Sequence, residues 1–203
     1  MRVRFLASRP AYRRVMAFNR GMKYFLFWLA ACLFSAAAQA APLCAGLASY
    51  PVQPLIGGKS FDLCKLDPKT TKAVLVVNTA SQCGFTPQYE SLEKLHQRFK
   101  AQGLLLVGIP ANDFGSQEKG SNKEIAEFCK INFGVSFTVA EKLQTTIGKD
   151  PLFARLAASS GKAPGWNFHK YLVSTKGAVQ SFDSAAEPLS PKLVAAIQSA
   201  LKP

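Results

Sequence analysis

The sequence predicts an α/β protein in which a central mixed β-sheet is flanked by helices on both faces. The apolar run AVLVVN at 73–78 has the length and continuity of a strand that is buried on both sides. A second run of this kind, LLLVGI at 104–109, follows a stretch with helical apolar spacing that ends at Gly103. Strand, helix and strand in this order form a βαβ unit, so we expect the two strands to be parallel.

The helix of this unit is expected to begin at Thr86-Pro87. Threonine is a favourable N-cap residue, and proline fits the first helical position because its missing N–H group is not needed there. The apolar residues that follow at helical spacing are Tyr89, Leu92, Leu95 and Phe99. We therefore expect the Thr86 side chain to cap this helix.

Further helices and one hairpin are expected in the second half of the chain. The signals are a capping box at 121–124, Asp150-Pro151, two strand-like runs at 169–173 and 178–182 around a Ser-Thr-Lys-Gly turn, and Ser190-Pro191 before a last helix to Leu201. Parallel strands followed by an antiparallel hairpin make a mixed sheet. This order of elements fits a thioredoxin-like α/β sandwich.

Composition and charge place broad limits on the class of protein. The 203 residues are 48% hydrophobic and 18% charged, which suits a globular chain with one core. The formal net charge is +13, but seven basic residues and no acidic ones lie in the first 40 positions, and the rest carries only +6. Nucleic acid is not an expected partner, because the sequence shows no basic stripe interleaved with aromatic residues.

The N-terminus is typical of an export signal. Lys23 precedes the apolar stretch YFLFWLAACLFSAAA, which leads to the cleavage pattern Ala38-Gln39-Ala40. This stretch is too short for a comfortable membrane span. We therefore expect residues 1–40 to be an N-terminal extension with a cleavable signal peptide, and residues 41–203 to be a single exported domain in the periplasm.

Three alternatives stay open for this segment. Met22 starts an ordinary signal peptide by itself, so the true start could be Met22 rather than Met1. Arg13-Arg14 could belong to a twin-arginine signal, although the pair lies far from the apolar stretch. The sequence LAAC, which ends at Cys32, resembles a lipoprotein box, but the apolar stretch continues past it.

Cys44 and Cys64 are candidates for a structural disulfide. They lie on either side of the Pro- and Gly-containing loop YPVQPLIGGKS, and disulfides persist in exported proteins. The alternative is that both are small buried hydrophobic residues.

Cys83 is the candidate nucleophile. It lies between a buried strand and the start of a helix, where free N–H groups and the helix dipole favour a thiolate. The residue that would complete a CxxC pair is Thr86, so dithiol exchange through such a pair is excluded. A single thiolate can instead attack the O–O bond of a peroxide, which gives a sulfenic acid that a second thiol resolves. The alternative is an inert buried cysteine.

Three sequence blocks resemble the glutathione peroxidase family in its cysteine form. They are VNTASQCGFTPQYESL at 77–92, PANDFGSQEKG at 110–120 and Trp166-Asn167-Phe168. The resemblance runs from about Leu63 to the C-terminus, with the blocks in family order. It implies a thioredoxin fold and a thiol-dependent peroxidase of antioxidant defence that reduces hydrogen peroxide or organic and lipid hydroperoxides.

The resemblance implies catalytic roles for four residues. Cys83 matches the peroxidatic cysteine, and Gln117, Trp166 and Asn167 match the polar partners that complete the family's catalytic tetrad. Amide and indole N–H groups are neutral donors, which can stabilise a sulfur anion without a counter-charge beside it. Taken one at a time, Gln117 and Asn167 are ordinary loop residues and Trp166 is an ordinary core aromatic.

Cys129, on the helix after the second block, is a candidate resolving thiol. It falls one residue before the position that plant-type members use, which is Lys130 here, so it can act only if the helix unwinds or rotates. The alternative is a packed helix cysteine.

His96 and His169 are expected on solvated or structural faces, and neither a metal nor a nucleotide cofactor is implied.

The resemblance also bears on the reductant and on assembly. The chain between Gly148 and Trp166 is short and lacks the long insertion that builds tetramers in animal members, so a monomer is expected. A thioredoxin-type protein or glutathione would serve as the thiol co-substrate.

Two other functions stay open: a non-catalytic redox sensor that changes a partner contact, and a thioredoxin-fold binding module in the cell envelope.

Overall fold

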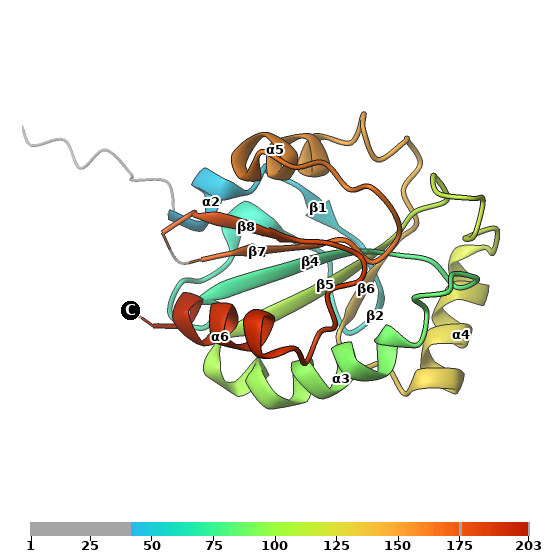
Figure 1. Ribbon diagram of the computed structural model, residues 1–203, viewed down its shortest axis with the longest axis horizontal. Helices are drawn as coiled ribbons and strands as arrows, with labels where there is room; N and C mark the ends of the chain where they lie inside the picture. The colour runs from blue at the N-terminus through green and yellow to red at the C-terminus, as the bar shows by residue number, and fades with distance from the viewer. Residues whose placement is uncertain (1–41, 175, 203) are drawn as a thin grey trace, which may run out of the picture. The chain divides into compact units, whose positions relative to one another are not determined.

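A six-stranded sheet forms the middle layer of the computed structural model, which describes residues 42–174 and 176–202 (Figure 1). Its strands in spatial order are β2 Pro54–Ile56, β6 Thr138–Ala140, β5 Leu104–Pro110, β4 Ala73–Thr79, β7 Lys170–Val173 and β8 Val179–Phe182. β4, β5 and β6 run parallel, whereas the other neighbours pair antiparallel. The predicted mixed sheet is confirmed.

β4 and β5 occupy the centre of the sheet because their sequences are apolar on both sides. Every residue of β4 is buried, and the register pairs Ala73 with Leu104 at one end and Thr79 with Pro110 at the other. The predicted βαβ unit is therefore present, with its strands parallel. A separate two-stranded ribbon is made of β1 Pro51–Val52 and β3 Phe61–Asp62.

Helices cover both faces of the sheet, as the sequence predicts. α3 Gln88–Phe99 and α6 Pro191–Ala200 lie on one face, and α5 Pro151–Ser160 and the short α2 Pro42–Gly46 lie on the other (Figure 1). α4 Asn122–Phe133 packs against α3 and β2, and the 3-10 turns η1 Leu63–Lys65 and η2 Lys100–Gln102 complete the described elements. Each face of the sheet has its own apolar core.

Most of the predicted helix starts are confirmed by their caps. Ser121 and Glu124 form the capping box of α4, Asp150 accepts hydrogen bonds at the start of α5, and Ser190 accepts one at the start of α6. The hairpin of β7 and β8 also forms where it is predicted.

The prediction that Thr86 caps α3 is wrong. The helix begins at Gln88, and its N-cap residue Pro87 has no side-chain hydrogen bond. The Thr86 hydroxyl instead accepts a hydrogen bond from Cys83 N–H at 2.9 Å and donates one to the carbonyl of Ala80 at 2.9 Å. Its side chain is therefore used in the turn before the helix, where these backbone groups are buried.

A disulfide joins Cys44 in α2 to Cys64 in η1. It has a sequence separation of 20 and lies on the same side of the sheet as α5, where the partly buried Cys64 packs against the core.

The predicted signal peptide within residues 1–40 and the lipoprotein box at Cys32 lie outside the described residues. Within the described ranges, the structure contains no helix that is long and apolar enough to cross a membrane.

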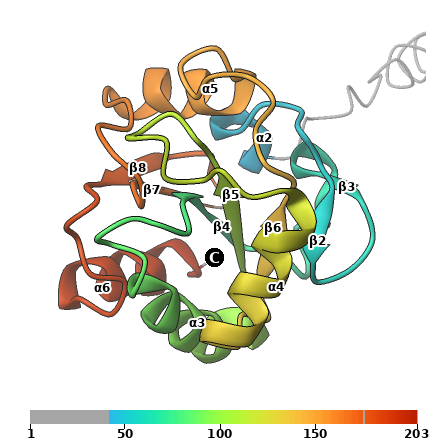
Figure 2. The same ribbon diagram turned by 90° about the vertical axis from the view of Figure 1, so that its right-hand side faces the viewer.

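The three sequence blocks meet at one edge of the sheet. Figure 2 looks onto this edge, which α3, α4 and α5 surround. The loops that follow the parallel strands β4 and β5 lie here, and the segment before β7 joins them because β7 is antiparallel to β4. The fold thus brings together residues that lie far apart in the sequence.

Candidate active site

Cys83 lies in the turn between β4 and α3, at the carboxyl end of the central strand. Its side chain is only 7% exposed and belongs to the core on the α3 side of the sheet. The backbone N–H of Phe85 donates a hydrogen bond to Cys83 Sγ at 3.4 Å. Thr86 closes the same turn through Cys83 N–H, so the direction of the Phe85 N–H group is fixed by the threonine hydroxyl.

The loop after β5 holds the Cys83 turn from the other side. Gln82 N–H donates to the carbonyl of Gln117 at 3.0 Å. Ser81 Oγ donates to Glu118 Oε2 at 3.1 Å, and Glu118 is almost fully buried. Burial raises the pKa of the Glu118 carboxyl, while the hydrogen bonds from Ser81 oppose this rise. The second sequence block is therefore bonded directly to the residues that precede the thiol.

Asn167 and Gln117 form a hydrogen-bonded pair. Asn167 is fully buried, and its Nδ2 group donates to Gln117 Oε1 at 3.0 Å and to the Phe114 carbonyl at 3.3 Å. Asn167 Oδ1 is buried and has no hydrogen-bond partner among the described residues. Because Asn167 fixes Gln117 Oε1 as an acceptor, the NH2 group of Gln117 is the part of this amide that can donate to a ligand.

Trp166 lies at the surface of the same edge. Its side chain is 40% exposed, and its ring centroid is 5.7 Å from that of Phe114. The alternative, that Trp166 is an ordinary core aromatic, therefore does not describe this residue. In the part of the chain that the structure describes, the hydrogen bond to Cys83 Sγ comes from Phe85, and the side chains of the other three predicted tetrad residues make none to the sulfur.

Asn78 is a site residue that the sequence reasoning missed. It is fully buried in β4, and its Nδ2 group donates to the Trp166 carbonyl at 3.1 Å while its Oδ1 accepts from His169 N–H at 3.0 Å. Its backbone carbonyl accepts a hydrogen bond from Phe168 N–H, and Phe168 itself has a positive φ of 64°. The signal for this role was a polar residue inside the apolar run at 73–78.

Cys129 is placed inside the protein, on the buried side of α4. Its side chain is fully buried in the core that also contains Cys83. Burial raises the pKa of the Cys129 thiol to about 11, while the nearby Tyr89 hydroxyl opposes this rise and the charge of Glu118 adds to it. In this conformation Cys129 is a packed and protonated thiol.

The two histidines do not contact the thiol in the described structure. His96 packs edge-on against Phe137, with ring centroids 6.1 Å apart. His169 is buried beside Tyr171, with ring centroids 4.7 Å apart, and burial lowers its pKa to about 4. A neutral His169 is therefore expected at physiological pH. The described residues contain no cluster of ligating side chains that could hold a metal ion.

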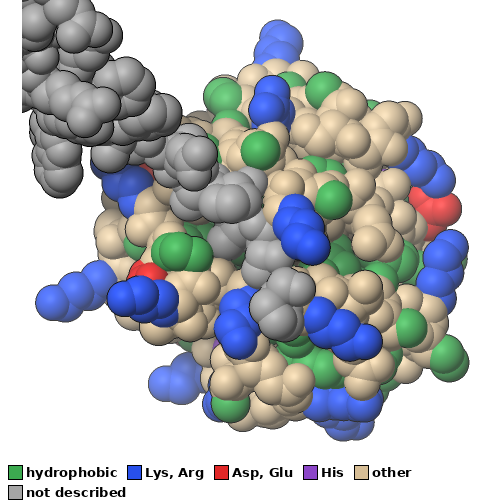
Figure 3. All heavy atoms as spheres, turned by 90° about the vertical axis from the view of Figure 1, so that its left-hand side faces the viewer, with side chains coloured by type: hydrophobic (Ala, Val, Ile, Leu, Met, Phe, Trp, Pro, Cys, Tyr) green, Lys and Arg blue, Asp and Glu red, His purple; other side chains and the backbone are tan. Residues whose placement is uncertain are grey.

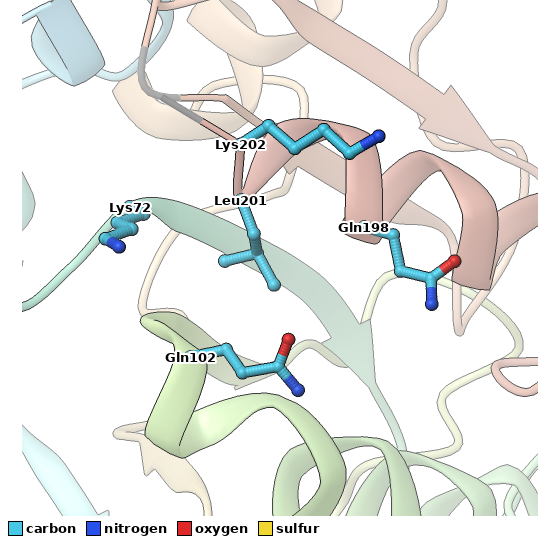
Figure 4. Close-up of a pocket in the computed structure, with 5 residues that line it drawn as sticks. All are labelled: Lys72, Gln102, Gln198, Leu201 and Lys202. Atoms are coloured by element: carbon cyan, nitrogen blue, oxygen red, sulfur yellow. The ribbon is translucent and has the colours of Figure 1, made fainter.

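Two hollows differ in their relation to Cys83. One, of about 210 Å³, adjoins the Cys83 turn and is lined by Ser81, Gln82, Glu118, Lys119, Gly120, Glu124, Ile125 and Phe128. A larger one, of about 620 Å³, lies where β4 begins, at the opposite end of that strand (Figure 4). Its lining is Lys72, Gln102, Gln198, Leu201 and Lys202, which includes no cysteine. Figure 3 shows that the left-hand face of Figure 1 exposes many Lys and Arg side chains and few acidic ones.

The fold and the site define a class of protein, a thiol-dependent peroxidase with a thioredoxin-like fold. A lone thiol follows the central strand, and polar groups from two further loops surround its turn. The chain belongs to the glutathione peroxidase family, whose sequence model matches residues 52–157.

Individual relatives agree with this family. The chain is 44% identical to the glutathione peroxidase-like peroxiredoxin HYR1 of Saccharomyces cerevisiae over 126 residues, which are 59% of this chain and 77% of the relative. It is 47% identical to a glutathione peroxidase of Lactococcus lactis over 124 residues, which are 58% and 78% of the two chains.

Solved structures show the same fold. The crystal structure of Trgpx in its apo form matches with a TM-score of 0.54 and 29% identity, over 75% of this chain and 93% of that chain. A thiol:disulfide interchange protein of the thioredoxin family from Chlorobium tepidum matches with a TM-score of 0.50 and 17% identity, over 77% and 97%. The second likeness shows the thioredoxin-like fold alone.

Proposed function

We propose that Cys83 reduces hydrogen peroxide or organic and lipid hydroperoxides. The thiolate attacks one peroxide oxygen, the O–O bond breaks, and the leaving oxygen takes up a proton and departs as water or an alcohol. The sulfur is oxidised to a sulfenic acid while the peroxide is reduced. The observation that carries this proposal is the Cys83 turn, in which the Phe85 N–H group faces the sulfur beside the Gln117–Asn167 pair.

The other three tetrad residues act when peroxide is bound in the site. Asn167 holds the oxygen of the Gln117 amide, so the NH2 group of Gln117 is the donor for the developing oxyanion. Trp166 is exposed enough for its indole N–H to meet the peroxide from the solvent side. Neutral donors suit this step because they stabilise negative charge as it forms.

We propose that Cys129 resolves the sulfenic acid only after α4 opens. Its thiol would attack the Cys83 sulfur, release water and form a disulfide. The buried position of Cys129 and its pKa of about 11 disfavour that attack while the helix is closed. A capping box and a glycine C-cap at Gly134 stabilise the ends of α4, so opening is expected to limit this step.

The Cys129→Ser variant tests this resolution step. We expect its first oxidation by peroxide to match that of the wild type, because Cys129 lies in α4 and makes no hydrogen bond to the Cys83 turn among the described residues. Mass spectrometry should then find a disulfide between residues 83 and 129 in the wild type and a persistent sulfenic acid in the variant. Unchanged turnover of the variant with a dithiol-relay reductant would remove the role.

The proposal extends to the reductant and the compartment. A thioredoxin-type protein or glutathione would supply the electrons, and the domain of residues 41–203 would act as a monomer. The apolar stretch and the cleavage pattern before Ala41 support export to the periplasm, with anchoring at Cys32 as the less favoured form. A mass for the recovered protein that corresponds to an N-terminus at Ala41 supports export, whereas an intact N-terminus contradicts it.

Peroxide consumption tests the proposed function directly. The wild-type protein with a thioredoxin system or with glutathione is expected to consume hydrogen peroxide and an alkyl hydroperoxide, and Cys83→Ser is expected to consume neither. Cys129→Ser is the matched control for the first turnover only, because it keeps the nucleophile and removes the proposed resolving thiol. Equal consumption by the wild type and Cys83→Ser would overturn the proposal.

A further inference from the structure

Lys170 is a buried cation that the proposed mechanism does not use. It lies in β7 and is fully buried, unlike every other lysine in the described part of the chain. A buried ammonium group is costly unless polar partners replace its water. No carboxylate of the described residues lies within 4.0 Å of its Nζ atom, so it is not held by an ion pair.

Backbone carbonyls replace the water around this ammonium group. Nζ donates hydrogen bonds to the carbonyl oxygens of Ala186 at 2.6 Å, of Ser184 at 3.1 Å and, at the limit, of Asp183 at 3.5 Å. All three carbonyls belong to the connection between β8 and α6. An ammonium group has three N–H donors, so its hydrogen bonds are all used within one short segment.

The same connection holds the first turn of α3. Gln88 is almost fully buried, and its Nε2 group donates to the Ser184 carbonyl at 2.8 Å. A carbonyl oxygen has two lone pairs, so Ser184 can accept from Lys170 and from Gln88 together. Gln88 N–H in turn donates to the carbonyl of Phe85 at 2.9 Å, and the N–H of that residue donates to Cys83 Sγ.

We infer that Lys170 is a positioning residue for the reactive thiol. Its ammonium group fixes the Ser184 carbonyl, that carbonyl fixes Gln88, and Gln88 fixes the turn that aims the Phe85 N–H group at Cys83 Sγ. A buried apolar residue would fill the same space in β7 but would leave these carbonyls without donors. This inference rests on the proposed function of Cys83.

A cycle of single and double variants tests the inference. Lys170→Met and Gln88→Leu are each expected to slow single-turnover oxidation of Cys83 about tenfold, because a small misplacement of a reacting group is costly. The double variant is expected to be no slower than either single variant, since both act through Ser184. Leu172→Ala is the matched control: it also weakens β7, where Leu172 is buried, and is expected to lower Tm but leave the oxidation rate unchanged.

A pH series separates the charge of Lys170 from simple packing. Burial lowers its pKa to about 8, and Glu187 and Asp183 are the acidic groups that oppose this shift. Above that pH the neutral amine has one N–H donor fewer. The ratio of the wild-type rate to the Lys170→Met rate is therefore expected to fall from about pH 7 to about pH 9.5, and the ratio cancels the ionisation of Cys83 itself.

The outcomes distinguish this inference from the proposed function. Alkylation of Cys83 by iodoacetamide is measured in parallel, because it reports on the turn even if peroxide does not react. A folded Lys170→Met variant with wild-type oxidation and alkylation rates, a ratio that is constant with pH, or fully multiplicative effects in the cycle would overturn the positioning role. If Lys170→Met does not fold, a wild-type rate in Gln88→Leu would overturn it.

Discussion

At the residue scale, the turn around Cys83 depends on one hydroxyl group. Thr86 bridges two buried backbone groups, the N–H of Cys83 and the carbonyl of Ala80. It occupies the position at which a CxxC protein has its second cysteine. The chain thus uses this position to hold the thiol rather than to exchange a disulfide with it.

Thr86→Val removes the hydroxyl and keeps the shape of the side chain. Because the Cys83 N–H and Ala80 carbonyl groups would lose their partner, we expect the free energy of unfolding to fall by about 2 kcal/mol. Single-turnover oxidation of Cys83 should slow as well. Urea unfolding and stopped-flow fluorescence measure the two effects. Thr86→Ser keeps the hydroxyl and should lose much less of both, so equal losses in the two variants would contradict this role.

The sequence showed which residues lie at the site more readily than it showed what each of them does there. The sequence pointed to Cys83, Gln117 and Asn167, and the structure brings them to one edge. It could not show that Thr86 turns away from the helix, because a threonine before proline satisfies the usual rule for an N-cap. Nor could it assign Asn78 or Lys170, since their roles depend on carbonyl groups that lie far away along the chain.

At the element scale, long buried strands and capped helices were predicted well. β4, β5, α4, α5 and α6 form where their patterns indicate, because strong apolar runs and caps act locally. The strands β2 and β6, on one side of the sheet, were not predicted. Each has only three residues, and β6 pairs with β5 while β2 pairs with β6, so both depend on distant strands rather than on a local pattern.

The disulfide between α2 and η1 should contribute to stability but not to chemistry. For a sequence separation of 20, we expect the double variant Cys44→Ala/Cys64→Ala to lose about 3 kcal/mol in free energy of unfolding. Its rate of Cys83 oxidation should stay at the wild-type value, because Cys64 packs on the other side of the sheet. Chemical unfolding and peroxide stopped flow test both points. A large loss of rate in the folded variant would contradict this separation.

At the scale of the whole molecule, buried His169 should make folding sensitive to acid. Burial lowers the folded-state pKa of His169 from its ordinary value of 6.5 to about 4, while Asp183 opposes this shift. Between these values the unfolded state binds the proton first, so stability is complete above about pH 6.5 and falls as the pH approaches 4. The loss from this one group is expected to reach about 3 kcal/mol.

Urea unfolding at about pH 7 and about pH 4.5 measures this loss. The variant His169→Phe keeps a ring beside Tyr171 and cannot be protonated, so the difference between its two unfolding free energies should be smaller than in the wild type. Carboxyl groups with shifted pKa values, such as Glu118, contribute equally to both proteins and cancel in the comparison. An identical pH dependence in the two proteins would show that His169 is not the acid-sensitive group.

The central claim is that Cys83, in the turn that this fold builds, reacts directly with peroxide. Stopped-flow tryptophan fluorescence of the reduced protein mixed with hydrogen peroxide tests it most directly, because Trp166 lies at the same edge of the sheet as the thiol. We predict a rapid change whose rate increases with peroxide concentration and which is absent in Cys83→Ser. A wild-type protein that shows no change, and whose Cys83 can still be alkylated after exposure to peroxide, would contradict the account.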